Sequence, residues 1–397
     1  MNTRTDCEVL IVGAGPVGLM LGNLLGKRGI KTLVVEKRTE LPVQSMAIGI
    51  TPPSLDILRT VGLDTAFERA GVTVRQAGVW ESRAPIGRLA FQGLPTEYSY
   101  ILSIPQTRTI ELLRENLRQF SSVTLSHGVE FNELQQDNEG VTVRLRELDS
   151  GIEMEVRARM LVACDGHRSA VRRAVGIEVR EKVYPQRWVM GDFIDGTDLG
   201  DAAHLFFASE ASVESFPLPG GRRRWIVLTP HGAPADPAGY LISEVRRLTG
   251  YDPGELMRES VSCFGAKRML AKRYGTGRVW LCGDAAHVMS SIGGQGMNTG
   301  FADAELAASS LAGALAEPAT LPQRLAVYDA ARRRAYNVAA GRAERGMYLG
   351  TARGWLASQA RKVIIRDILF SRWLAARLAP YFAMLTIPPN PMTGERA

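Results

Sequence analysis

One stretch of the chain, residues 283–300, combines bare backbone with a few polar side chains in a way that suits ligand binding. It contains five glycines and no Lys, Arg or Glu, and it lies between an apolar segment at 277–282 and an Ala-rich segment. The apolar segment predicts a short buried strand with Asp284 at its carboxyl end, where open α/β sheets bind ligands. A helix expected from Met297 onward would direct its free N–H groups and the positive end of its dipole toward the glycines. We therefore expect a ligand here, because a purely structural turn rarely needs so many glycines, each of which costs conformational entropy on folding.

A second ligand-binding pattern lies near the start of the chain. Residues 7–12 predict a buried strand that runs into the GxGxxG sequence at 13–18 and then into an apolar helix, and a second strand at 31–36 ends in Glu36. In such a unit Gly13 makes a tight turn, Gly15 lets the backbone approach a pyrophosphate and Gly18 lets helix and strand pack closely. The terminal acid can accept hydrogen bonds from a ribose. The pattern predicts a dinucleotide-binding βαβ unit.

A third strand end follows residues 160–164. It carries Asp165 and Gly166, with Arg168 and Arg172 one helical turn apart. Two guanidinium groups at this spacing could bind phosphates. The alternative is that Asp165 caps the start of a charged, solvated helix.

The elements that position these segments predict two interleaved domains. Strands at 123–127, 128–136, 141–146 and 153–159, with a hairpin turn at 137–140, extend the nucleotide-binding part, and helices open at Pro52 and beside Gln106. Alternating segments at 72–104, 187–194, 203–207, 212–216 and 224–228 predict one antiparallel sheet that would cover the substrate. We read Arg222-Arg223-Arg224 as a solvated hairpin. The expected domains are a cofactor domain of 1–71, 104–176 and 271–350, a substrate-binding sheet domain of 72–103 and 177–270, and a C-terminal helical segment of 351–397.

Composition narrows the class of protein. The chain has 397 residues, 45% of them hydrophobic, a formal net charge of +7 and only 7% aromatic residues, so we expect it to bind phosphates or acidic small molecules and not nucleic acid. Its four cysteines show no CxxC spacing, which predicts neither a disulfide framework nor a metal site and favours a reducing cytoplasm. No secretory signal and no apolar run of the ~18 residues needed to span a membrane is evident.

Taken together, the three patterns resemble the class A flavin-dependent monooxygenases, the family of para-hydroxybenzoate hydroxylase and of many aromatic-polyketide hydroxylases. The resemblance covers roughly residues 7–330 and implies an α/β fold, with a doubly wound dinucleotide-binding sheet, an inserted antiparallel-sheet substrate domain and C-terminal helices. It implies FAD as the cofactor and NAD(P)H as the reductant. In this family oxygen adds at flavin C4a, and the resulting hydroperoxide hydroxylates an electron-rich phenolic or polyketide-type ring.

The resemblance also implies roles for individual residues. Asp284 would hold the ribityl and pyrophosphate region, Gln106 would contact the flavin nucleotide, and residues 294–298 would line the isoalloxazine. The cofactor-binding residues implied are Gly13, Gly15, Pro16, Gly18, Glu36, Lys37, Gln106, Asp165, Asp284, Gly294, Gln295, Gly296, Met297 and Asn298, with Asp165 and Arg168 also expected at the NAD(P)H site. Two departures stand out: Met46-Ala47 replaces a common Arg-Ala pair, and Met289-Ser290-Ser291 replaces the usual prolines.

The group that would activate a phenolic substrate stays open at this point. His204, Tyr98, Tyr100 and Arg187 are the candidates for a base or hydrogen-bond network, although each has an ordinary structural alternative. His287 lies in the cofactor motif, where a structural or flavin-side role is favoured over proton transfer to substrate.

Other classes of function are also compatible with parts of the sequence. One is a flavin dehydrogenase or reductase without oxygen insertion; a halogenase is disfavoured because the Trp-x-Trp-x-Ile-Pro motif is not found. Another is a flavoprotein, monomer or homodimer, whose tail lies on an anionic membrane or a partner. The tail residues behind that alternative are Trp355, Leu356, Val363, Ile364, Ile368, Leu369, Trp373, Leu374 and Leu378, interspersed with Arg361, Lys362, Arg366, Arg372 and Arg377.

Overall fold

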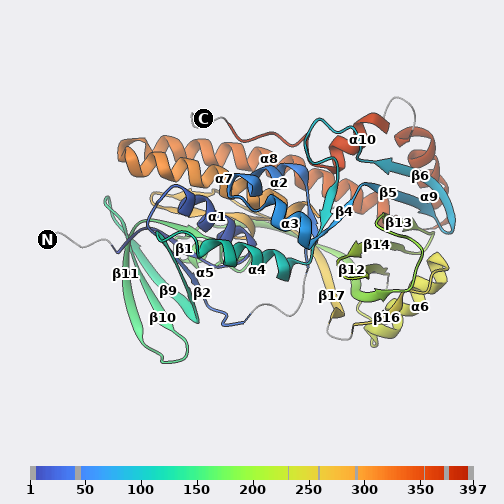
Figure 1. Cartoon of the computed structure of the whole chain (residues 1–397), viewed down its shortest axis with the longest axis horizontal. Helices are drawn as coiled ribbons and strands as arrows, with labels where there is room; N and C mark the ends of the chain where they lie inside the picture. Colours follow the sequence, from blue (N-terminus) through green and yellow to red (C-terminus); the bar gives the residue numbers. More distant parts are fainter. Residues whose placement is uncertain are drawn as a thin grey trace.

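Two sheets at opposite ends of the molecule are connected by long helices in a computed structural model (Figure 1). The structure describes residues 6–40, 46–230, 232–257, 260–290, 294–352, 354–370 and 375–391. Helix α8 (Leu321–Thr351) runs along one side from the first sheet toward the second. This arrangement confirms the expected α/β class with an inserted sheet domain.

The first sheet has a parallel centre. Its order is β18 (Gly275–Thr276), β19 (Val279–Leu281), β11 (Glu153–Ala163), β1 (Cys7–Val12), β2 (Thr32–Glu36) and β8 (Val123–His127), and the last five strands are parallel. The near-continuous apolar sequence of β1 and the end of β11 fits strands that are buried on both faces. β11 joins two segments that the sequence predicted as separate strands.

Helices and a hairpin complete the first sheet. Helix α1 (Pro16–Lys27) packs against both α4 (Gln106–Leu117) and α7 (Gln295–Ala316). The hairpin of β9 (Val129–Gln136) and β10 (Val141–Glu147) pairs with the first half of β11. Asp137 Oδ1 accepts hydrogen bonds from the N–H groups of Glu139 and Gly140, which confirms the predicted turn. Helix α7 begins two residues earlier than expected because Gly294 adopts a left-handed conformation that starts it.

The second sheet is nine-stranded and mostly antiparallel. Its order is β20 (His287–Val288), β17 (Ser262–Ala271), β12 (Val179–Asp195), β15 (Arg222–Thr229), β14 (Ser212–Leu218), β13 (Ala203–Phe207), β5 (Gln76–Glu81) and β6 (Ala84–Ala90), with β16 (Gly254–Leu256) on β12. The pair β13–β5 is parallel. Helix α6 (Pro237–Thr249) covers one face, where a Cβ at Gly191 would lie 2.9 Å from Leu241.

The remaining elements are short. They are α2 (Pro52–Thr60), α3 (Asp64–Ala70), α5 (Ala170–Ala174), the 3-10 helices η2 (Gly283–Ala285) and η3 (Pro318–Thr320), and a three-stranded sheet of β3 (Gly49–Ile50), β7 (Ile101–Ser103) and β4 (Val72–Val74). β4 thus belongs to this small sheet and not to the larger one that the sequence predicted for it. Helix α2 starts at the two prolines as expected.

The C-terminal segment packs against β5 and β6. It forms α9 (Trp355–Val363), the π-helix η4 (Ile364–Leu369) and α10 (Ala375–Phe382), which lie beside β6 in Figure 1. Arg361 is buried, and its Nη2 donates to Glu81 Oε1 at 3.1 Å. Trp355 and Leu356 are exposed, whereas Ile365 is buried with Val79 and Ile86. Of the predicted tail residues, Arg372, Trp373 and Leu374 lie outside the described residues.

No helix within the described ranges is long and apolar enough to cross a membrane.

Candidate functional site

Three strand ends with ligand-binding patterns lie side by side at one edge of the first sheet. β11 is the parallel neighbour of both β1 and β19, with Ala163 paired to Val12 on one side and Leu281 on the other. The Cys164 N–H donates to the Val12 carbonyl at 2.7 Å, and the Cys282 N–H donates to the Ala163 carbonyl at 2.9 Å. The glycine-rich turn at 13–18, the turn at 165–166 and the turn at 283–284 therefore form one site.

The glycines of the first turn differ in their surroundings. Gly13 has a φ of +105°, and a Cβ there would lie 2.4 Å from the Cys164 carbonyl oxygen. A Cβ on Gly18 would lie 2.0 Å from the Gly13 carbonyl oxygen, so Gly18 allows helix and strand to approach closely. A Cβ on Gly15, the residue that caps α1 ahead of Pro16, would meet no atom within 4 Å. The space beside Gly15 is therefore open to a ligand.

Glu36 lies against this turn. Its Oε2 accepts a hydrogen bond from the Ala14 N–H at 2.8 Å, and its Oε1 accepts one from the Arg38 N–H. Lys37 between them is exposed. The carboxylate is thus positioned beside the glycines by the end of β2, as a βαβ unit requires.

Val17 connects the first turn to the third. A Cβ on Gly300 would lie 2.5 Å from Val17 Cγ2, and one on Gly283 would lie 3.0 Å from the same atom. Both glycines therefore make room for Val17, and α1 packs directly on α7.

The start of α7 presents unobstructed backbone. A Cβ on Gly294 or Gly296 would meet no atom within 4 Å, and Met297 follows them in the first turn. Gln295 Oε1 is buried without a hydrogen-bond partner among the described residues. The free N–H groups of a helix start and an unpaired buried amide oxygen both fit a polar ligand at this point.

Asn298 fixes this helix start to the segment after β3. Its Oδ1 accepts a hydrogen bond from the Thr51 N–H at 2.9 Å, and its Nδ2 donates to the carbonyls of Gly49 and Gly294. The side chain therefore positions the helix, and the backbone is left to face the ligand.

Two aspartates border the site. Asp165 Oδ2 accepts hydrogen bonds from the Ala170 and Val171 N–H groups, which supports the capping alternative, while its Oδ1 is buried with no partner among the described residues. Burial raises the pKa of Asp165 and that of Asp284. The Asp284 side chain is exposed to solvent at the third turn.

Arg172 does not join Arg168 as a second phosphate ligand. Its Nη1 donates to the Ala285 carbonyl at 2.7 Å and its Nη2 to the His167 carbonyl at 3.0 Å, so it connects the second and third turns. Arg168 is exposed beside them.

A buried ionic network supports the third turn from behind. Asp303 accepts hydrogen bonds from the Gly283 N–H at 3.0 Å, from His287 Nε2 at 2.6 Å and from Arg332 Nε at 2.6 Å. Burial alone would raise the pKa of Asp303, but His287 and Arg332 keep it below its ordinary value. His287 is therefore held in a structural network of the cofactor motif.

The four candidates for substrate activation lie in three separate places. His204 accepts a hydrogen bond from Trp80 Nε1 at 3.0 Å. It lies on the sheet face that α6 covers, since cross-strand partners share a face and the pairs His204–Ser215, Ser215–Trp225 and Trp225–Gly191 lead to Gly191 beneath α6. The Tyr98 hydroxyl donates to Asp64 at 2.8 Å, the Tyr100 hydroxyl donates to Glu68, and Arg187 is exposed. The Tyr98 and Tyr100 rings meet edge to face with their centroids 6.1 Å apart, but His204 and Arg187 do not join them.

The run at 222–224 is not a solvated hairpin as the sequence predicted. Arg223 and Arg224 are both buried, on opposite faces of β15, and pair with Asp195 and Asp192 respectively. The sequence interpretation was wrong because each arginine finds its carboxylate on the adjacent strand β12, a partner distant in the sequence.

Arg224 also contacts Met46, the position at which the family commonly has an arginine. Its Nη1 donates to the Met46 carbonyl at 3.2 Å, and the Met46 N–H donates to Gln106 Oε1 at 3.3 Å. A guanidinium group from the second sheet thus stands beside Met46 and Gln106.

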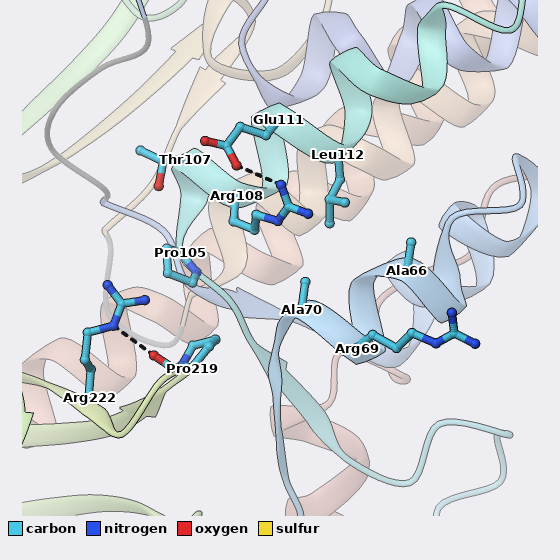
Figure 2. A pocket seen from close by; sticks show the side chains of 10 residues that line it. All are labelled: Ala66, Arg69, Ala70, Pro105, Thr107, Arg108, Glu111, Leu112, Pro219 and Arg222. Carbon is cyan, nitrogen blue, oxygen red and sulfur yellow. Dashed lines mark hydrogen bonds and ion pairs between the residues drawn. The ribbon is translucent and has the colours of Figure 1, made fainter.

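A separate pocket of about 540 Å³ lies between α3, the start of α4 and the β14–β15 turn (Figure 2). Arg108 Nη1 donates to Glu111 at 2.9 Å and Arg222 Nε donates to the Pro219 carbonyl at 2.8 Å, so both guanidinium groups have protein partners. The lining residues are Ala66, Arg69, Ala70, Pro105, Thr107, Arg108, Glu111, Leu112, Pro219 and Arg222. None belongs to the three turns.

Comparison with known proteins places the chain in a family. A family model described as FAD binding domain matches residues 6–343. Rifampicin monooxygenase from Streptomyces venezuelae is 32% identical over 304 residues, which are 75% of this chain and 62% of that relative. 6-Methylpretetramide 4-monooxygenase from Streptomyces rimosus is 33% identical over 308 residues, 75% of this chain and 54% of that relative. The chain thus spans between about half and two thirds of the length of these curated relatives.

Solved structures agree with the fold. The anhydrotetracycline hydroxylase from Streptomyces rimosus superposes with a TM-score of 0.77 at 29% identity, covering 98% of this chain and 78% of that one. p-Nitrophenol 4-monooxygenase from Pseudomonas putida gives a TM-score of 0.87 at 23% identity, covering 96% and 99% of the two chains, which shows the shared fold. The expected resemblance to flavin-dependent aromatic monooxygenases is confirmed. The chain belongs to the FAD binding domain family, and FAD is the cofactor that its three adjacent turns were expected to hold.

Proposed function

We propose that the protein is a flavin monooxygenase that uses NAD(P)H and O2 to hydroxylate an electron-rich aromatic small molecule of the phenolic or polyketide type. The observation that carries this proposal is the convergence of three strand ends and the bare start of α7 on one site, next to a sheet face that points toward it. The names of the relatives, which include rifampicin monooxygenase and 6-methylpretetramide 4-monooxygenase, support the same class of reaction.

The residues present fit FAD. The open backbone at Gly15 and the N-terminus of α1 would hold the pyrophosphate, Glu36 would accept hydrogen bonds from the adenosine ribose, and Asp284 would hold the ribityl region. The N–H groups at residues 296–298 would stabilise negative charge on the ring system. When bound, FAD supplies electron transfer from NAD(P)H and the activation of O2.

The protein's own contribution is to exclude water and to position the substrate. Leu205, Phe207, Phe216 and Ile226 are partly exposed on the sheet face opposite α6 and offer an apolar surface for an aromatic ring. Such a surface keeps competing water away from the reacting atoms. For the nicotinamide nucleotide, Arg168 beside Asp165 remains the proposed contact, since its guanidinium group is exposed at the edge of the site.

The test starts from the absorbance of the purified protein, which should show bound FAD or acquire it on reconstitution. NADH and NADPH oxidation is then followed with a panel of mono- and polycyclic phenols, and products are analysed by mass spectrometry after reaction under isotopically labelled O2. Labelled oxygen in the product supports the proposal. A protein that cannot take up FAD contradicts it, and substrate-stimulated NAD(P)H oxidation without an oxygenated product would instead indicate a dehydrogenase.

A further inference from the structure

One face of the second sheet is left partly open. Along β13, β14 and β15 the residues that point toward α6 are buried, whereas several of the alternate residues are partly exposed. We call these alternate residues the open face: Leu205, Phe207, Glu214, Phe216 and Ile226. The alternation follows from the two-residue period of a strand, and the partial exposure shows that this side is covered less closely than the side under α6.

The open face is turned toward the cofactor domain. Arg224 lies on the same side of β15 as Ile226, two residues away, and its Nη1 donates to the Met46 carbonyl of the cofactor domain. At the other end of the face, Arg361 of α9 lies 5.1 Å from the centre of the Phe207 ring. The face is therefore bounded by the cofactor domain on one side and by the C-terminal helices on the other.

Among the five residues of the open face Glu214 is the ionisable one, and it lies at the centre of the face. Its cross-strand neighbours are Leu205 on β13 and Ile226 on β15, and Phe216 follows two residues along the same side of β14. Its carboxylate has no hydrogen bond or ion pair with any residue that the structure describes. A carboxylate held without a partner among apolar side chains is costly unless a ligand satisfies it.

The charged groups around Glu214 are already paired. Arg224 on the same face is bonded to Asp192, and Glu81 at the edge is bonded to Arg361. The strands β4 and β7, which contact β14, contain no ionisable side chain, and His204 on β13 faces α6. Burial alone raises the pKa of Glu214 to about 7, a value suited to a base that works near neutral pH.

We propose that Glu214 binds the hydroxyl group of the aromatic substrate and acts as its base, so that the site selects phenols and rejects aromatic carboxylates. This inference rests on the proposed function and names a residue of the same site. In the step, the phenolic O–H bond breaks as the ring is attacked, the proton forms an O–H bond with the Glu214 carboxylate, and the electron pair stays on the phenolic oxygen, where it makes the ring more electron-rich. An aromatic carboxylate would place a second negative charge beside Glu214, which has no ion-pair partner among the described residues.

The binding test uses two probes of the same size, 2-naphthol and 2-naphthoate, added to the FAD-loaded protein and followed through the flavin absorbance. At pH 8 we expect 2-naphthol to bind at least about tenfold more tightly than 2-naphthoate. As the pH falls from 8 to 6, Glu214 takes up a proton, so 2-naphthoate should bind more tightly. In Glu214→Gln the preference should fall below about threefold and its pH dependence should disappear.

Glu210→Gln is the matched control, because Glu210 is an exposed residue at the adjacent hairpin that pairs with Arg247. It should behave as the unaltered protein, and FAD content should be the same in both variants. Equal responses to the two probes, a response to neither, or an unchanged preference in Glu214→Gln would overturn the inference.

Turnover separates this inference from the proposed function. With a phenol that the unaltered protein hydroxylates, Glu214→Gln should still oxidise NAD(P)H but form hydroxylated product at least about tenfold more slowly, without the fall in rate below pH 7. Absence of any oxygenated product in the unaltered protein would count against the proposed function. Normal product formation by Glu214→Gln would count against Glu214 alone.

Discussion

His287 Nε2 lies 2.6 Å from Asp303 Oδ2 at the back of the third cofactor turn, and both side chains are almost fully buried. The same carboxylate accepts hydrogen bonds from the Gly283 N–H and from Arg332 Nε, and Arg332 Nη1 donates to Asn390 Oδ1. One aspartate, through Arg332, thus connects the turn that carries Asp284, the first turns of α7 and Asn390.

Asp303→Asn should destabilise the protein by about 3 to 5 kcal/mol, because it leaves the buried Arg332 guanidinium without its charged partner. The midpoint of thermal unfolding and the FAD content should both fall. In the unaltered protein the pKa of Asp303 is lower in the folded state than its ordinary value of 3.8, so the ionised carboxylate stabilises the fold at pH values above 3.8. This stabilisation is lost as the pH falls through the folded-state pKa. The exposed pair of Asp367 with Arg366 provides the control, since Asp367→Asn should leave the unfolding midpoint nearly unchanged. Equal effects of the two variants would contradict the central role of Asp303.

Gly15→Ala and Gly18→Ala should separate cofactor binding from folding. The alanine methyl at position 15 enters open space, so the FAD-free protein should keep its stability within about 0.5 kcal/mol while FAD occupancy drops about tenfold. The methyl at position 18 overlaps the Gly13 carbonyl, which should cost about 2 kcal/mol or more. Chemical unfolding and the flavin absorbance measure the two effects. Undiminished FAD content in Gly15→Ala would mean that the pyrophosphate does not bind there.

Asp284→Ala should lower FAD occupancy about tenfold and leave the secondary structure unchanged. The carboxylate is exposed and bonds to no described residue, so we expect its loss to remove a ligand contact and no internal one. Flavin absorbance and circular dichroism of the purified variant give the answer. Full flavin content would show that Asp284 does not contact FAD.

Glu214→Gln should raise the unfolding midpoint of the FAD-loaded protein at pH 8 by roughly 2 to 4 °C. The folded-state pKa of about 7 lies above the ordinary 4.5, so the ionised carboxylate destabilises the fold above pH 7. This penalty decreases as the pH falls from 7 toward 4.5, and near pH 5 the variant and the unaltered protein should unfold at similar temperatures. A difference that does not vary with pH would argue against an unpaired carboxylate at this position.

Arg361→Met should destabilise the protein by about 3 kcal/mol, because the largely buried Glu81 would lose its charged partner and keep only the Ser358 hydroxyl. Since the C-terminal helices pack on the protein's own sheet, we also expect no retention by anionic vesicles, and Leu356→Ser, at an exposed position of α9, should leave both stability and vesicle partitioning unchanged. Vesicle binding that Leu356→Ser abolishes would favour the membrane alternative instead.

The cofactor half of the candidate site could be predicted from the sequence because the residues that indicate it lie close together along the chain. Gly13, Gly15 and Gly18 are spaced within one turn, and the strand before each turn is a short apolar run. The substrate half could not be predicted in this way. The two-residue period of β14 places Val213 and Ser215 on one face of the sheet and Glu214 and Phe216 on the other. Which face is buried depends on the position of α6, which the sequence of the strand does not indicate. His204 was a reasonable candidate by residue type, yet the register of β13 turns it toward Trp80 and away from the cofactor domain.

The short strand β20 belongs to both halves of the molecule. It directly follows the turn that carries Asp284, and His287 and Val288 pair with Leu270 and Met269 on β17, at the edge of the second sheet. A hinge motion that separated the halves at this point would have to break those backbone hydrogen bonds. A displacement of the turn at 283–284 is therefore coupled through β20 to the edge of the second sheet.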